Sequence, residues 1–314
     1  DVIELADDHP DRHVVVKGDT LWDISSHFLT KPWYWPEIWT LNRQVQNPHL
    51  IYPGDVLLLE WRNGRPAVRF AGDLGPRVRT SDLGPAIPLL NPALLKPFLR
   101  GPRLVSEQLL QTAPYMLQSV DEHLLVSAGD RIYARGFVGK PLNRWDLLRR
   151  NREYRDPVTN ELLGIEAMTI GTALLERFAD PAVMLLTETV RAARPGDRLL
   201  PPVSLDLNVL PSQPSQNIDG QIVSVYDGVG NIGQYQIVTL NLGKREGLVA
   251  GNVLSAYRRG EEVLDSIAIE PELVQLPAER AGALLVFQTD ERFSHALVMQ
   301  STRPLKLGDL ARNP

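Results

Sequence analysis

The chain of 314 residues contains no cysteine. This absence excludes a thiol nucleophile, a disulfide framework and a zinc site with cysteine ligands. Basic residues do not predominate either, because 33 Lys and Arg stand against 38 Asp and Glu, which gives a net charge of −5. A nucleic-acid partner requires a basic face, so we expect none. No apolar run approaches the roughly 18 residues that a membrane-crossing helix needs, so we expect no transmembrane segment.

Catalytic and metal-binding motifs are scarce as well. The six histidines form no H-E-x-x-H or H-x-H pattern, and no G-x-S-x-G elbow occurs. Residues 228–233 match G-x-G-x-x-G, but a strand pattern follows instead of the helix that a dinucleotide site requires. We therefore predict a hairpin turn there, and no cofactor, no metal site and no enzymatic activity. A pair of glycosidase carboxylates that meet only in the folded chain stays open as an alternative.

What the chain does contain begins near its N-terminus. Residues 14–17 are a short β-branched stretch that ends at Gly18, which predicts a strand followed by a turn. Thr20 lies three residues before Asp23, the spacing of a capping box, so a helix should begin near Asp19. One face of that helix is apolar, with the i, i+3, i+7 positions Leu21, Ile24 and Phe28.

A second helix should follow, because Pro36 suits a first helical turn and Ile38, Leu41 and Val45 repeat the apolar spacing. Asn47-Pro48 should end it. Residues 52–55, Y-P-G-D, predict a turn, and Val56 to Leu59 predict a closing strand. The sequence thus predicts a strand–helix–helix–strand unit of roughly 45 to 50 residues, near the lower size limit of an independent core.

This unit resembles the LysM domain, through V-V-K-G-D-T-L-W-D-I (15–24), Asn42 at the end of the second helix and N-P-H-L-I-Y-P-G-D (47–55). The resemblance implies binding of N-acetylglucosamine polymers, peptidoglycan in bacteria and chitin elsewhere, in a groove between two loops. We expect the helix opening to present free backbone amides and the second loop to form an apolar floor. The residues expected at the groove are Gly18, Asp19, Thr20, Leu21, Asn47, Pro48, Leu50, Ile51, Tyr52 and Pro53.

An aromatic insertion at 31–35, K-P-W-Y-W, departs from the family pattern. Its rings can stack on sugars, or the tryptophans can complete a very small core, because aromatic side chains dominate the energetics of such cores. We favour the core interpretation for Trp22, Trp35 and Trp39.

The composition changes after Trp61. Residues 62–120 carry frequent prolines, which favour an extended, semi-rigid backbone. The leucines within this arm should be docked, either on the protein's own domains or on a partner. A second proline-containing stretch, residues 203–216, is predicted to be a linker.

The remaining chain contains an internal repeat. A-G-D-R-I (128–132) opens the first unit and P-G-D-R-L (195–199) closes it, whereas A-G-N-V-L (250–254) and L-G-D-L (307–310) bound the second. The first unit also contains an insertion, residues 143–164, predicted as a basic short helix followed by a turn. Strands are predicted in the second at Gln221 to Asp227, Gln234 to Gly243, Asn252 to Arg258, Ala283 to Gln288 and His295 to Gln300.

The predicted fold class is α+β: an N-terminal LysM unit, an extended Pro-rich arm and two tandem, related small β-barrel or sandwich modules. The predicted domains are 1–61, the LysM peptidoglycan-binding domain; 62–120, the arm; 121–202, the first β module; 203–216, the linker; and 217–314, the second β module.

The whole chain resembles the type IV pilus secretin-associated protein family, whose C-terminal region is similar to that of a flagellar assembly protein. The resemblance lies in residues 33–39, 47–55, 127–136, 196–201 and 240–248. It implies a non-catalytic periplasmic anchor that joins peptidoglycan to the outer-membrane secretin oligomer. The sequence opens with Asp1 and has no initiator methionine, which we interpret as an exported, processed form. The alternatives are a peptidoglycan hydrolase with an unrecognised site and a scaffold for another envelope complex.

Overall fold

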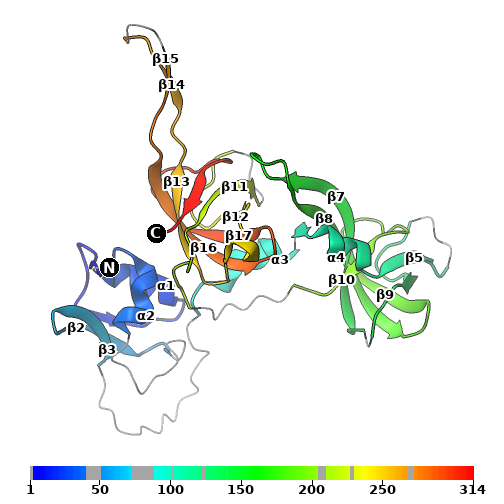
Figure 1. Cartoon of the computed structure of the whole chain (residues 1–314). Coiled ribbons are helices and arrows are strands. Elements are labelled where there is room, and N and C mark those ends of the chain that lie inside the picture. The colour runs from blue at the N-terminus through cyan, green and yellow to red at the C-terminus, as the bar shows by residue number, and fades with distance from the viewer. Residues whose placement is uncertain are drawn as a thin grey trace.

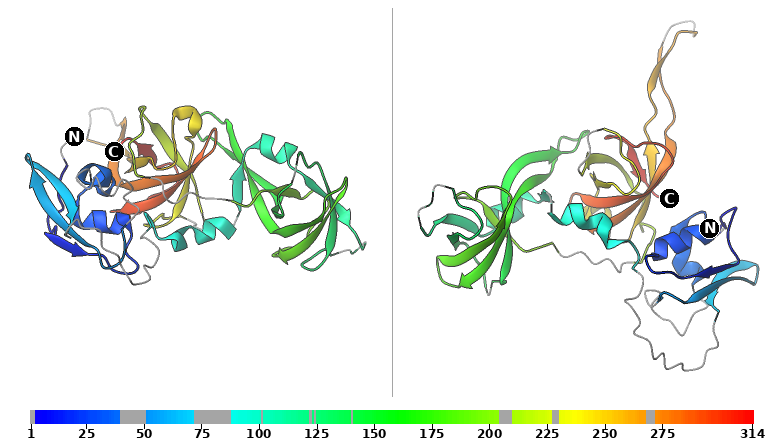
Figure 2. Two further views of the ribbon diagram at one scale, coloured as in Figure 1. Left: turned by 90° about the horizontal axis from the view of Figure 1, so that it is seen from below. Right: turned by 180° about the vertical axis from the view of Figure 1, so that it is seen from behind.

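The computed structural model describes residues 3–39, 51–71, 88–100, 102–121, 123, 125–139, 141–203, 210–226, 230–267 and 272–314. Strands predominate in these residues, and the helices are short. The N-terminal unit and the first β module lie on opposite sides of the second β module (Figures 1 and 2).

The N-terminal unit is a three-stranded antiparallel sheet with short helices packed on it. Its elements are β1 (Arg12–Val14), α1 (Leu21–Phe28), η1 (Pro32–Tyr34), α2 (Trp35–Ile38), β2 (Val56–Arg62) and β3 (Arg65–Phe70), in the sheet order β1-β2-β3. The expected helix start is confirmed, since the Thr20 hydroxyl accepts the Asp23 N–H at 3.1 Å. Residues 41, 42 and 45 of the predicted second helix, its predicted end at 47–48 and the expected groove residue Leu50 lie outside the described residues.

The prediction of an extended arm over 62–120 is wrong for the residues that the structure describes. The segment contains β3, then η2 (Pro92–Leu95), α3 (Lys96–Arg100), β4 (Arg103–Val105), α4 (Glu107–Thr112) and β5 (Tyr115–Ser119). Pro92 occupies a first-turn position, where it requires no N–H partner, and the Asn91 side chain caps the turn. Proline therefore starts helical turns here, while Leu95 and Phe98 bury the inner face.

The first β module consists of β5 with β6 (Arg131–Arg135), β7 (Arg144–Arg155), β8 (Leu162–Arg177), β9 (Ala182–Thr189) and β10 (Arg198–Leu200). The strands pair in the order β8-β7-β10-β5-β6-β9, and an additional pairing of β8 with β9 closes the ring. The helix predicted at 143–164 is wrong. Those residues form β7, a turn at Asp156 and the start of β8, because Trp145 and Leu147 alternate into the core and tertiary pairing overrides helix propensity.

The second β module is a closed barrel of β11 (Asp219–Val225), β12 (Ile237–Leu240), β13 (Val253–Arg258), β16 (Glu279–Thr289), β17 (Ser294–Ser301) and β18 (Leu310–Arg312). The five strands predicted for this region correspond to β11, β12, β13, β16 and β17. Pairing runs β11-β12-β17-β16-β13-β18, the same order, strand for strand, as in the first module. Residues 244–246 form η3 (Lys244–Glu246), and β14 (Glu262–Asp265) and β15 (Glu272–Gln275) form a separate hairpin that projects from the barrel (Figure 1).

One kind of turn recurs in all three units. A glycine with φ between 86° and 106° precedes an Asp or Asn whose side chain accepts, at 2.7–3.0 Å, the N–H of the residue three positions earlier. The positive φ explains the glycine, because a Cβ strains this conformation. These turns have Asp19, Asp55, Asp130, Asp197, Asn252 and Asp309 at the accepting position.

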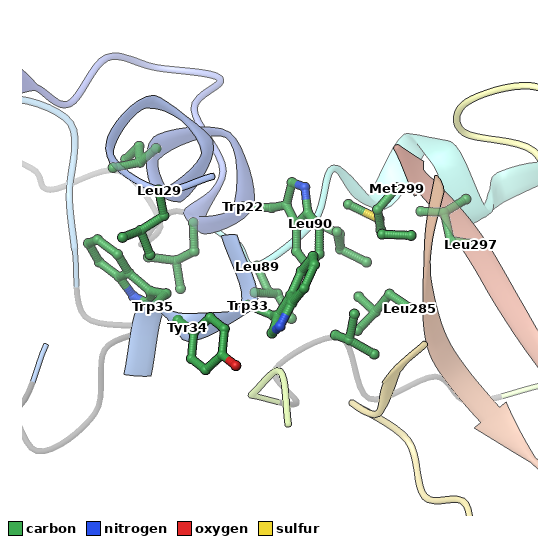
Figure 3. Packing of buried hydrophobic residues seen from close by; sticks show 14 of the residues in the cluster. Trp22, Leu29, Trp33, Tyr34, Trp35, Leu89, Leu90, Leu285, Leu297 and Met299 are labelled. Atoms are coloured by element: carbon green, nitrogen blue, oxygen red, sulfur yellow. The ribbon is translucent and has the colours of Figure 1, made fainter. Parts of the chain in front are cut away.

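The N-terminal unit shares one core with the second barrel. Leu89 and Leu90 belong to one buried cluster with Trp22 and Trp33 of this unit and with barrel residues such as Leu285 and Met299 (Figure 3). Of the leucines of the predicted arm, Leu89, Leu90, Leu94 and Leu95 are thus docked on the protein's own domains, whereas Leu99 is exposed. The shared apolar core fixes the N-terminal unit against the barrel.

Ion pairs and hydrogen bonds connect the two β modules. Arg245 on η3 lies 2.9 Å from Glu161, and Asn241 donates to Asp156 at 2.5 Å. Hydrogen bonds to two carboxylates raise the pKa of Arg245, and the bond to Glu161 has a larger effect than the bond to Glu246. The β7–β8 turn is therefore held against the second barrel by several polar contacts.

Candidate glycan-binding site

The two loops that sequence analysis assigned to the groove are neighbours in the fold. The Val15 N–H donates to the backbone carbonyl of Asp55 at 2.9 Å, and the Val15 carbonyl accepts the Gly54 N–H at 2.8 Å. This pair continues the β1–β2 ladder by one residue, so the 18–21 loop and the 51–55 turn emerge side by side. Of the expected residues, Asn47, Pro48 and Leu50 lie outside the described residues.

Asp19 and Asp55 shape these loops from within. The Asp19 carboxylate accepts the Val16 N–H at 3.0 Å and lies 2.9 Å from Nε2 of His13, while Asp55 accepts the Tyr52 N–H at 2.9 Å. Both belong to the recurrent turn that also shapes the β modules. Asp19 is therefore a turn-forming residue that helps to fix the position of the 18–21 loop.

Four of the seven expected groove residues that the structure describes reach the surface. Gly18 and Pro53 are exposed and Asp19 and Tyr52 are half-buried, whereas Thr20, Leu21 and Ile51 are buried. An apolar floor is expected from residues 50–53. Of those that the structure describes, Ile51 belongs to the core, and only Tyr52 and Pro53 are accessible. The accessible surface is narrow and combines a ring, a proline and backbone at Gly18.

The expectation of free amides at the helix opening is wrong. The Leu21 N–H donates to the carbonyl of Pro88 at 3.0 Å, and the Trp22 N–H donates to the carbonyl of Leu89 at 3.2 Å. With the Asp23 N–H bound to Thr20, the first-turn amides of α1 are satisfied inside the chain. The sequence analysis did not predict that the carbonyls of Pro88 and Leu89 cap this helix. A local pattern does not indicate contacts between a helix end and a segment more than 60 residues away.

The aromatic insertion belongs to the core. Trp22, Trp33, Trp35 and Trp39 are buried, with the Trp35 and Trp39 rings 5.0 Å apart and those of Trp22 and Trp33 6.5 Å apart.

Two polar side chains of the C-terminal region hold this aromatic face. The Arg280 guanidinium lies 5.8 Å from the Trp33 ring, and Gln213 donates to the Tyr34 hydroxyl at 2.8 Å. Trp33 and Tyr34 of the insertion therefore lie on the side of the unit that faces the C-terminal region, as Figure 3 shows for Trp33 and Leu285.

The described fold and loop geometry agree with one family comparison. Residues 13–59 match the LysM domain model. This segment is a LysM domain. LysM domains bind glycans that contain N-acetylglucosamine, so the match supports glycan binding of the peptidoglycan type by this part of the chain. No curated protein matches the chain.

The LysM match covers the two loops described above, from His13 in β1 to Leu59 in β2. Within the described residues, no three His, Asp or Glu side chains gather as a metal-binding group. No helix in the same part of the chain has the length and apolarity needed to cross a membrane.

Proposed function

We propose that this protein is a non-catalytic periplasmic anchor that binds peptidoglycan through its LysM domain and the outer-membrane type IV pilus secretin through residues 62–314. The observation that carries the proposal is the shared core between the LysM domain and the second barrel. An anchor transmits force between its two binding ends. A continuous apolar core, with α1 capped by Pro88 and Leu89, transmits it more directly than a flexible linker.

The glycan end is supported by the family match and by the adjacent loops. Tyr52 and Pro53 offer apolar surface for sugar faces and acetamido methyls, next to the backbone of Gly18. The secretin end is supported by the resemblance in residues 127–136, 196–201 and 240–248, which lie in the two β modules. Linking two binding ends in one chain raises the effective concentration of each at the other's site.

The proposal is tested with the full chain and two purified ligands, peptidoglycan sacculi and a secretin oligomer. We expect sedimentation with sacculi, capture of the secretin and co-sedimentation of secretin only when the protein is added. Release of soluble muropeptides from sacculi would favour a hydrolase instead. Sedimentation with sacculi without secretin capture would leave the glycan end standing and would contradict the secretin end.

A further inference from the structure

The β14–β15 hairpin is a separate two-stranded sheet that extends away from the second barrel (Figures 1 and 2). Its register pairs Val263 with Val274 and Leu264 with Leu273. Neither strand pairs with any other described strand, so both outer edges are open. A lone hairpin of this kind is marginally stable in water, and open edges are templates for another strand.

The hairpin exposes apolar side chains on both faces. Cross-strand pairing places Val263 and Val274 on one face and Leu264 and Leu273 on the other. Exposure reaches 60% at Leu264, 67% at Leu273 and 95% at Ile267. Contiguous exposed apolar surface of this kind marks an interaction site.

The charge of the hairpin restricts what can cover it. The segment 261–276 contains Glu261, Glu262, Asp265, Glu270 and Glu272 and no Lys, Arg or His. Asp265 lies directly opposite Glu272, and like charges in this position destabilise a strand pair. An anionic membrane surface repels such a segment, and so does the same hairpin of a second copy. Basic side chains on a partner protein relieve this repulsion.

The base of the hairpin is fixed. The Leu276 N–H donates to the backbone carbonyl of Glu261 at 3.0 Å, and the Arg258 guanidinium lies 3.2 Å from the Glu261 carboxylate. Gly260 approaches the Leu276 carbonyl so closely that a Cβ would collide with it. The barrel thus presents the hairpin in a defined direction, and a partner does not have to immobilise its base.

We infer that the β14–β15 hairpin is a docking arm that adds to an exposed strand edge of a partner protein, with Lys or Arg side chains beside that edge. Main-chain hydrogen bonds along the open edge give affinity, and the apolar and acidic side chains give selectivity. The identification of the secretin as that partner rests on the proposed anchor function. The inference that the partner offers a strand edge with basic side chains rests on the hairpin alone.

The test places a photocrosslinking amino acid at position 264 of the full chain in cells. A second variant carries the same amino acid at Val158, an exposed residue of the β7–β8 turn, as the control site. A charge-reversed variant carries E262K, D265K and E272K. A charge-matched control carries D7K, D8K and E188K, which are exposed and remote from the hairpin. Unchanged thermal unfolding verifies that each variant folds.

We expect position 264 to form an adduct with a partner peptide that contains a strand with adjacent Lys or Arg. The adduct should fall about tenfold in the charge-reversed variant and persist in the charge-matched one. An adduct of this type on the secretin supports both proposals. On a different envelope protein it supports the docking arm and contradicts the secretin assignment. No adduct, an adduct with lipid or with a second copy, equal yield from Val158, or indifference to charge reversal overturns the inference.

Discussion

The backbone N–H of Leu21 donates a hydrogen bond to the carbonyl oxygen of Pro88 at 3.0 Å. Trp22 and Leu89 repeat the same contact one residue further, so the first turn of the LysM helix is closed by residues 88–89, next to Leu90 in the core shared with the barrel. The positive end of the helix dipole thereby faces internal carbonyls. The 18–21 loop and the docked residues 88–90 consequently meet at one helix end.

Leu90→Ala should loosen this linkage. Leu90 is buried in the shared core, so truncation should lower the free energy of unfolding by about 3 kcal/mol. Amide hydrogen exchange at Leu21 and Trp22 should accelerate, because residues 88–89 lose their support. Leu99→Ala, at an exposed position of α3, is the control and should change neither quantity appreciably. Unchanged exchange at Leu21 in the Leu90 variant would contradict the linkage.

Thr20→Ala should remove the helix cap. The hydroxyl accepts the Asp23 N–H at 3.1 Å and donates to the Asp23 carboxylate at 2.7 Å. Its loss should destabilise the LysM domain by about 1 kcal/mol, measured by denaturant unfolding. Thr20→Ser keeps the hydroxyl and should retain most of the stability; equal losses in both variants would assign the effect to the methyl group.

Tyr52→Ala should weaken retention on peptidoglycan sacculi by about tenfold, which corresponds to the loss of roughly 1.4 kcal/mol of contact energy. Asp19→Ala should weaken retention as well, because the 18–21 loop loses the carboxylate that accepts the Val16 N–H. Both variants should keep partner binding through residues 62–314. Trp61→Ala removes an exposed ring on β2, outside the two loops, and should leave retention intact. A similar loss in the Trp61 variant would move the glycan surface to the sheet.

His295 should make the stability of the second barrel depend on pH. Burial lowers the pKa of His295 from 6.5 to about 3, and its Nδ1 lies 3.1 Å from the Thr239 hydroxyl. Because the unfolded chain takes up a proton below pH 6.5 and the folded chain does not, stability present above that pH is lost as the pH falls toward 3.

At pH 5 the loss should be about 2 kcal/mol, because pH 5 lies 1.5 units below the pKa of 6.5 in the unfolded chain and each unit is worth about 1.4 kcal/mol. Denaturant unfolding of His295→Gln should show a weaker decline between pH 7 and pH 5 than the parent protein. His123→Gln, at an exposed site, should retain the decline. An identical pH profile for the His295 variant and the parent would show that other groups cause it.

Local pattern was sufficient where short-range chemistry decides the structure. Thr20 and Asp23 predict the start of α1 because capping involves residues three positions apart. The alternating residues of β12 predict a strand, and the repeated glycines correspond to turns that need a positive φ. The adjacency of the two groove loops followed from the LysM resemblance and from the pairing of β1 with β2.

The sequence by itself determined the LysM unit, the strand-rich modules and the turns, since each depends on near neighbours along the chain. Only the tertiary structure decided that residues 143–164 form two paired strands, that residues 92–100 and 107–112 of the predicted arm form helical turns, and that Pro88 and Leu89 cap the LysM helix. These outcomes depend on burial and pairing between distant segments. Arg-rich or Pro-rich local composition does not encode such contacts, because their free energy comes from surface removed from water only when the whole chain is folded.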